Sequence, residues 1–132
     1  MSVLEKSVQR DILLAIGAEP DLLLMRNTVG TAKYYDEETG KRRVITYGLG
    51  TGTPDIVGIL FDERTGLGVW FCIECKRPGE TSTVKQREVR QAWETFGALV
   101  YECHSASEAL EALAMARKTV ERRTAFSASR SA

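Results

Sequence analysis

The spacing of apolar positions predicts a helix over residues 2–16. Its apolar residues recur every four positions, at Leu4, Val8, Ile12 and Ile16. Because a helix turns by about 100° per residue, Glu5 and Gln9 fall on or near this apolar face rather than opposite it. A polar group on a buried face needs a partner, so we expect both side chains to point toward a polar site. The alternative is a short helix whose first turn is solvated.

The rest of the chain alternates between apolar runs, turn-like segments and helical patterns. The predicted elements are helix 2–16, a short apolar segment at 22–25, hairpin arms at 32–35 and 41–47, central strands at 56–61 and 69–73, helix 83–96, strand 98–103 and a last helix from residue 105. Glycines and a proline cluster just before the first central strand, where they favour tight turns. This order predicts an α/β fold, with a mixed central β-sheet flanked by α-helices.

Size and composition are those of one soluble domain. The chain has 132 residues, of which 43% are hydrophobic, and its 18 acidic residues balance 18 basic ones. We expect a single domain over residues 1–118, followed by a disordered tail rich in Ser, Ala and Arg at 119–132. No apolar run has the length of a membrane span, no secretory leader is recognisable, and three cysteines suit a reducing compartment. These features predict a cytoplasmic protein, and the zero net charge by itself does not indicate nucleic-acid binding.

Charged residues lie at the ends of both predicted central strands. Asp55 precedes the apolar run that begins at Ile56, whereas Glu74 and Lys76 follow the run that ends at Ile73. Buried charged side chains are rare unless they are paired or bind metal. Strand side chains alternate, so Glu74 and Lys76 share one face, roughly 7 Å apart along the chain. If the strands are neighbours, two carboxylates and an ammonium meet in one place. This set suits a hard cation and metal-assisted attack on a phosphodiester.

The hypothesis gives each residue of this site a role. Asp55, Glu74 and the backbone carbonyl of Cys75 would bind Mg²⁺ or Mn²⁺, with Glu5 as a further candidate ligand. Lys76 would position the attacking water and offset charge in the transition state. Gln86, at the start of helix 83–96, would hold the phosphate or Lys76. The predicted catalytic residues are therefore Glu5, Asp55, Glu74, Lys76 and Gln86.

Each motif has an ordinary structural alternative when it is taken alone. Asp55 follows a proline, and Pro-Asp is common in turns. Glu74 and Lys76 could form a surface ion pair, which contributes little to stability. Their occurrence at comparable ends of the only two central strands favours the joint site.

Three cysteines and the single histidine raise the question of a zinc site. Cys72, Cys75, Cys103 and His104 have a suitable composition. On a strand, however, residues 72 and 75 face opposite sides, so no zinc knuckle is expected there. Buried free cysteines and a structural histidine are the favoured interpretation.

The motifs together resemble a known family. Pro54-Asp55 followed by Glu74-x-Lys76 resembles the core of the PD-(D/E)XK nuclease superfamily. The fuller pattern resembles the VRR-NUC (virus-type replication-repair nuclease) family over most of residues 1–110. It comprises Glu5 and Gln9 on a leading helix, Arg26-Asn27, the glycine-rich run at 50–55, Glu74-Cys75-Lys76 with Arg77-Pro78-Gly79, and Gln86 opening a helix.

The resemblance implies a restriction-endonuclease-like fold and metal-dependent cleavage of branched DNA. Small stand-alone members of the family look like phage-borne, homodimeric Holliday-junction resolvases, whereas larger relatives act on flaps. We therefore expect a structure-selective endodeoxyribonuclease that uses Mg²⁺ or Mn²⁺, acts on four-way junctions or flaps and works as a homodimer away from membranes. The alternatives are a nicking, flap or linear-DNA nuclease with the same site, and an inert DNA-binding module.

The expected DNA contacts combine basic, aromatic and amide side chains. Basic and aromatic residues on the predicted hairpin suit backbone contact or a wedge at a branch point, although a solvated surface hairpin is equally compatible with the pattern. The candidate DNA-binding residues are Gln9, Asn27, Lys33, Tyr34, Tyr35, Lys41, Arg42, Arg43, Arg77 and Lys85.

Overall fold

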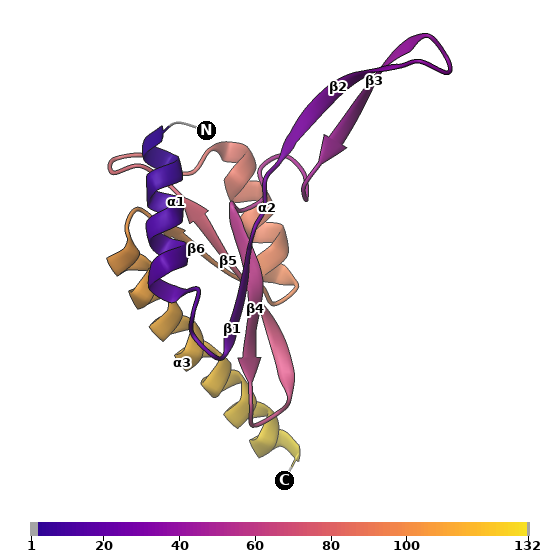
Figure 1. Ribbon diagram of the computed structural model, residues 1–132. Helices are drawn as coiled ribbons and strands as arrows, with labels where there is room; N and C mark the ends of the chain where they lie inside the picture. The colour runs from indigo at the N-terminus through magenta and orange to yellow at the C-terminus, as the bar shows by residue number, and fades with distance from the viewer. Residues whose placement is uncertain (1–2, 132) are drawn as a thin grey trace.

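The computed structural model describes residues 3–131 and contains three helices and six strands within that range (Figure 1). The elements in chain order are α1 (Val3–Ile16), β1 (Leu22–Arg26), β2 (Gly30–Asp36), β3 (Lys41–Tyr47), β4 (Ile56–Asp62), β5 (Leu67–Cys75), α2 (Val84–Thr95), β6 (Leu99–Cys103) and α3 (Ala106–Ser131). Every element that the hydrophobic pattern predicts is present, with ends that differ by a few residues except at the C-terminal end of α3.

The central sheet has four strands in the order β1-β4-β5-β6. The β1–β4 and β4–β5 pairs are antiparallel, whereas β5 and β6 run parallel and are connected through α2. The register places Ile56 opposite Ile73, at the end of the sheet where β4 begins and β5 finishes. The predicted mixed α/β sheet with flanking helices is confirmed, and the residues just outside this pair are Asp55 and Glu74.

The two faces of the sheet are covered by different helices. On one face, α1 and α3 pack together over the main core, which includes the fully buried Ile12, Phe71 and Leu113. On the other face, Val57 and Cys72 pack with Trp93 of α2. Strand alternation separates these two sets, because successive side chains point to opposite faces. Glu74, which follows Ile73 by one position, is therefore on the α2 side.

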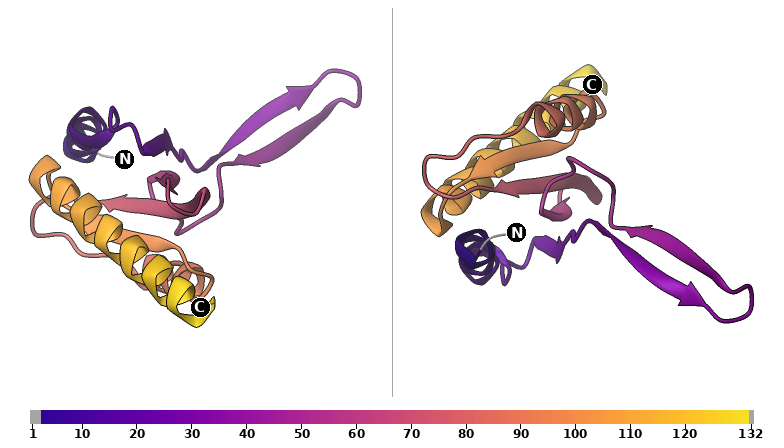
Figure 2. Two further views of the ribbon diagram at one scale, coloured as in Figure 1. Left: turned by 90° about the horizontal axis from the view of Figure 1, so that it is seen from below. Right: turned by 90° about the horizontal axis from the view of Figure 1, so that it is seen from above.

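The β2–β3 hairpin forms a second sheet that projects from the body of the protein (Figures 1 and 2). It is inserted between β1 and β4, and every side chain of β3 is exposed. The predicted hairpin is thus confirmed, with a longer first arm that begins at Gly30.

The C-terminal segment differs from the prediction. The expected disordered tail at 119–132 is a continuation of α3 as far as Ser131, and Val120 is only 5% exposed. The composition of residues 119–132 suggested disorder, but Val120 extends the buried stripe that Ala109, Ala112, Leu113 and Ala116 form along α3. Alanines bury little surface individually but let a helix approach the sheet closely. Within residues 3–131, no helix is long and apolar enough to cross a membrane.

Candidate active site

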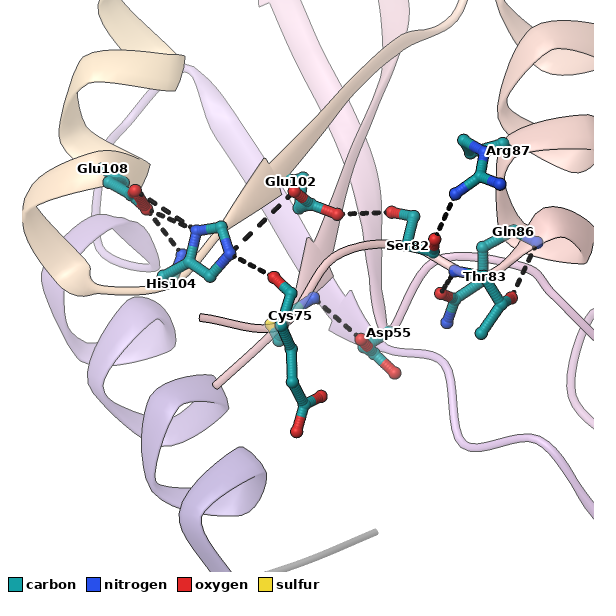
Figure 3. Close-up of polar contacts among 10 residues, drawn as sticks. Asp55, Cys75, Ser82, Thr83, Gln86, Arg87, Glu102, His104 and Glu108 are labelled. Atoms are coloured by element: carbon teal, nitrogen blue, oxygen red, sulfur yellow. Dashed lines mark hydrogen bonds and ion pairs between the residues drawn. The ribbon is translucent and has the colours of Figure 1, made fainter. Parts of the chain in front are cut away.

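The antiparallel register of β4 and β5 brings Asp55 next to Glu74. Asp55 immediately precedes β4, and its carboxylate oxygen Oδ2 accepts a hydrogen bond of 2.8 Å from the backbone N–H of Cys75 (Figure 3). This bond fixes the orientation of the Asp55 carboxylate at the end of β5. The sequence predicted the two carboxylates as neighbours, but it gave no sign that a backbone N–H of β5 would hold one of them.

Glu74 is buried in an environment that disfavours its negative charge. Its side chain is on the α2 face of the sheet, and the residue is only 5% exposed. Burial, the nearby charge of Asp55 and a hydrogen bond to Asp55 together raise the pKa of Glu74 to about 9, against the lowering effect of Lys76. Two carboxylates in contact cannot both stay ionised without a compensating positive charge. The pair is therefore suited to a cation.

Lys76 provides one positive charge beside this pair. The residue is 7% exposed, and its backbone N–H donates to the carbonyl of Cys103 over 3.0 Å, which anchors it to the end of β6. The charge of Lys76 is close enough to Glu74 to lower the pKa of that carboxylate. The predicted combination of two carboxylates and one lysine is thus assembled.

Gln86 connects the first turn of α2 to the carboxylate pair. Its amide Nε2 donates to Glu74 Oε1 over 2.9 Å, while its Oε1 accepts from the backbone N–H of Thr83 over 2.9 Å. Thr83 in turn accepts from the backbone N–H of Gln86 over 3.2 Å, which completes a capping box. The helix cap therefore sets the position of Gln86, and Gln86 contacts Glu74 rather than Lys76.

A cleft of about 620 Å³ opens in front of the carboxylates. Its lining residues are Glu5, Lys6, Gln9, Arg26, Asn27, Thr28, Val29, Gly52, Thr53, Asp55 and Gln86. Five residues singled out from the sequence are among them, including Glu5 and Gln9 of α1, so the expectation that these two face a polar site is confirmed. Glu74 and Lys76 lie behind this wall.

Two cations of the cleft were not predicted as site residues. Lys6 follows Glu5 on α1, and Arg26 is the last residue of β1. Both give the cleft positive charge beside its carboxylates. Lys6 was signalled only by its position next to Glu5, whereas Arg26 belongs to the Arg26-Asn27 part of the family pattern, where it was given no role.

Asn27 has a structural role that the sequence did not predict. Its Nδ2 donates to Thr53 Oγ1 and to the carbonyl of Pro54, both over 2.8 Å, and its Oδ1 accepts from the backbone N–H of Leu49 over 3.0 Å. Its backbone N–H also donates to the carbonyl of Asp55 over 2.7 Å. These bonds tie the end of β1 to the glycine-rich loop, so Asn27 positions Asp55, while its contact with DNA stays a prediction.

The other predicted DNA contacts are divided between two places. Lys85 lies at the edge of the cleft, against Gly52. Gly52 has φ +83°, and a Cβ added to it would lie only 2.7 Å from Lys85 Cγ. Arg77 lies outside the cleft lining and forms an ion pair with Glu80. The predicted hairpin contacts are all on the projecting β2–β3 sheet, away from the carboxylates (Figure 1).

His104 has a structural role beside the site. Its Nδ1 lies 3.0 Å from a carboxylate oxygen of Glu108, and its Nε2 lies 2.8 Å from the carbonyl oxygen of Glu80 (Figure 3). Both partners are acceptors, so both ring nitrogens donate and the imidazolium form is favoured. The hydrogen bond to Glu80 and the neighbouring Glu108 raise the pKa of His104. The histidine thus fastens the loop after β5 to the start of α3, as expected for a structural residue.

The cysteines lie on opposite faces of the sheet. Cys72 belongs to the α2-side cluster, whereas Cys75 and Cys103 belong to the main core, and all three are buried free thiols. The predicted separation of residues 72 and 75 is confirmed. Among the described residues, no three His, Cys, Asp or Glu side chains form a ready-made metal cluster, and Asp55 and Glu74 are a pair.

No known family model matches the chain, and no curated protein matches it either. The chemistry of the site therefore has to be argued from its geometry. A cleft with acidic oxygens, a buried lysine, an amide and two cations can bind a divalent cation and an anionic substrate together.

Proposed function

We propose that this protein is a divalent-metal-dependent endodeoxyribonuclease that hydrolyses phosphodiester bonds in branched DNA, with the four-way junction as its preferred substrate. The observation that carries the proposal is the convergence of Asp55, Glu74, Lys76 and Gln86 at the end of the β4–β5 pair, beside a cleft. Two carboxylates in contact each destabilise the charged form of the other, so a purely structural group of charges rarely has this arrangement beside a polar cleft.

The donor set fits Mg²⁺ or Mn²⁺. These hard cations take oxygen ligands, and Mg²⁺ is commonly held by one or two carboxylates together with waters and substrate phosphate. Asp55 and Glu74 would supply the carboxylates, the Cys75 carbonyl a further oxygen, and Glu5 of the cleft wall an additional ligand. When bound, such an ion polarises the phosphate and acidifies a coordinated water.

The protein's own residues would orient the reactants. Lys76 would hold the attacking water and offset the charge that develops on the phosphate oxygens as the water oxygen bonds to phosphorus and the P–O bond to one sugar breaks. Gln86 would keep the Glu74 carboxylate in position through their hydrogen bond. Lys6 and Arg26 would draw the anionic backbone into the cleft.

The family resemblance favours branched DNA and a homodimer, because symmetric cutting of a junction needs two active sites. The projecting hairpin is consistent with a substrate that is larger than the cleft. The restriction-endonuclease-like fold and a cytoplasmic location, including that of a phage-infected host, are parts of the same proposal. The three buried free thiols support a reducing compartment.

Cleavage of labelled DNA tests the proposal. A four-way junction, a 5′ flap and a linear duplex would be incubated with Mg²⁺ or Mn²⁺ and with the wild type, Asp55→Asn or Glu63→Gln. Asn retains an oxygen that can accept the hydrogen bond from Cys75, so the fold should persist while one anionic ligand is lost. Glu63 is an exposed acid near the turn at the far end of β4 and controls for the change in charge.

The proposal predicts paired symmetric cuts in the junction, lost by about 100-fold or more in Asp55→Asn and kept in Glu63→Gln. Equal cutting of flap or duplex would retain the nuclease and exclude junction preference. An active Asp55→Asn protein would refute the site, and tight binding without cutting would indicate an inert DNA-binding module. Sedimentation of the free protein tests the dimer.

A further inference from the structure

The register of the β2–β3 hairpin divides its side chains into two faces with different chemistry. Paired residues of an antiparallel ladder lie on the same face, and their neighbours along the strand lie on the opposite one. The Lys33 face consists of Thr31, Lys33, Tyr35, Arg42, Val44 and Thr46. The Arg43 face consists of the alternate positions, among them Tyr34, Asp36, Arg43, Ile45 and Tyr47. From the sequence alone, the basic and aromatic residues of the hairpin formed one set of candidate DNA contacts. The register separates them into two faces.

The positive charge of the Arg43 face is largely neutralised within the hairpin. Arg43 Nε lies 2.9 Å from Asp36 Oδ2, and Lys41 is the register partner of the same aspartate. The remaining large side chains on this face, Tyr34, Ile45 and Tyr47, are aromatic or aliphatic. An anionic ligand would gain little charge attraction here.

The Lys33 face keeps its positive charge. Lys33 and Arg42 flank Tyr35, no acidic residue occupies a strand position on this face, and no ion pair of either cation is found in the part of the chain that the structure describes. Lys33, Tyr35 and Arg42 also border a hollow of about 220 Å³, whose rim includes Tyr34 of the other face. Tyr35 is 63% exposed, so its ring is available for stacking.

The hairpin is rooted in the candidate active site. Thr28 and Val29 lead into β2, Gly52 and Thr53 lie in the segment that leaves β3, and all four line the cleft. A chain that enters the cleft can therefore continue along the hairpin. A two-stranded ribbon is marginally stable in water by itself, which favours a ribbon that is covered by its ligand.

We propose that the Lys33 face binds a DNA strand of the substrate, with Lys33 and Arg42 contacting phosphates and Tyr35 stacking on a base, while the Arg43 face makes no DNA contact. This inference rests on the proposed function, since it assigns the part of the substrate that extends beyond the cleft. Charge complementarity identifies the occupant: unneutralised cations around an exposed aromatic ring match the alternation of phosphate and base in nucleic acid.

Two pairs of adjacent residues provide matched variants for the test. Arg42→Ala and Arg43→Ala remove the same side chain from opposite faces, as do Tyr35→Ala and Tyr34→Ala. Binding of a fluorescent four-way junction would be followed by anisotropy in EDTA at several salt concentrations, so that no cleavage occurs. Circular dichroism would confirm that each variant folds, and Arg42→Lys would test rescue by charge.

We expect Arg42→Ala to reduce the slope of log Kd against log salt by about one, with partial recovery in Arg42→Lys. Tyr35→Ala should weaken binding by about fivefold or more. Arg43→Ala should match the wild type, and Tyr34→Ala should weaken binding less than Tyr35→Ala. Equal losses within each pair, or no loss in either, would overturn the assignment, and a changed oligomeric state in Arg42→Ala would assign the face to a second copy instead.

Failure of the inference can be told apart from failure of the proposed function. If the wild type cuts the junction in Mg²⁺ but the two variants of each pair bind DNA equally well, only the face assignment is refuted. A wild type that binds through the Lys33 face without cutting refutes only the nuclease. A wild type that binds no DNA refutes both.

Discussion

Replacing Asn27 with Ala separates a structural role of this residue from a DNA contact. The amide side chain makes hydrogen bonds to Thr53, Pro54 and Leu49, and through them it holds the glycine-rich loop that leads to Asp55. If the amide clamps the loop, its loss lowers the free energy of unfolding in the absence of any ligand. If the amide were reserved for DNA, stability would not change.

The expected loss follows from the bonds and their exposure. A net hydrogen bond contributes about 1 kcal/mol, and an unpaired buried group costs more than an exposed one. The bonds from Asn27 Nδ2 to Thr53 Oγ1 and to the Pro54 carbonyl are partly buried, whereas the bond from the Leu49 N–H is exposed and can be replaced by water. Counting the two protected bonds, Asn27→Ala should lower the free energy of unfolding by about 2 kcal/mol.

Urea unfolding followed by tryptophan fluorescence measures this loss, since Trp70 and Trp93 pack together with ring centroids 6.0 Å apart. The control is Thr28→Ala, a change at the exposed neighbouring residue, which should stay within about 0.5 kcal/mol of the wild type. The m-value should be unchanged in both variants. If Asn27→Ala were as stable as Thr28→Ala, the clamp would be refuted and the amide would again be a candidate DNA contact.

Three further changes test the electrostatics and the cap of the site. Because the pKa of Glu74 is raised, the folded state without metal holds a proton that the unfolded state releases, so stability should fall as pH rises from about 4.5 to about 9. In a series of melting temperatures measured in EDTA, Glu74→Gln should flatten this fall. Parallel curves for the variant and the wild type would contradict the prediction. The pKa of His104 is also raised, so its contribution to stability is complete below the ordinary pKa of 6.5 and is lost as pH rises through the pKa of the folded state. His104→Asn should therefore lower the free energy of unfolding by about 1 kcal/mol at pH 6 and by less at pH 9. A loss that does not depend on pH would count against the imidazolium form. Thr83→Ala should cost about 1 kcal/mol in urea unfolding, while Thr83→Ser should keep most of the cap; equal losses would show that the hydroxyl is not what matters.

The candidate site could be predicted in outline because its parts follow short-range rules. Alternation along β5 fixes the side of the sheet on which Glu74 and Lys76 lie, and a four-residue period fixes the face of Glu5 and Gln9. These rules do not depend on distant parts of the chain. The structural role of Asn27 could not be predicted in this way, because its partners are more than twenty residues away in sequence.

The same distinction explains the other corrections. The tail was assigned to disorder from its composition, but Val120 packs in the main core and Arg123 donates to the carbonyl of the distant Gly97. His104 was expected to be structural, but its contact with Glu80 could not be predicted, because Glu80 lies in the loop after β5 and meets the histidine only when β5 and β6 align in parallel. The hairpin residues formed one basic and aromatic set until the register placed alternate residues on opposite faces.

The sequence by itself determined the elements, their order and the residue types of the site, because apolar periodicity and turn chemistry act between near neighbours. Tertiary structure alone decided which groups meet. The antiparallel register put Asp55 against the Cys75 N–H and raised the pKa of Glu74, and the α2 cap brought Gln86 to that carboxylate. Burial and like-charge contact are properties of packed strands and helices, so the electrostatics of this site arise only when the sheet is assembled.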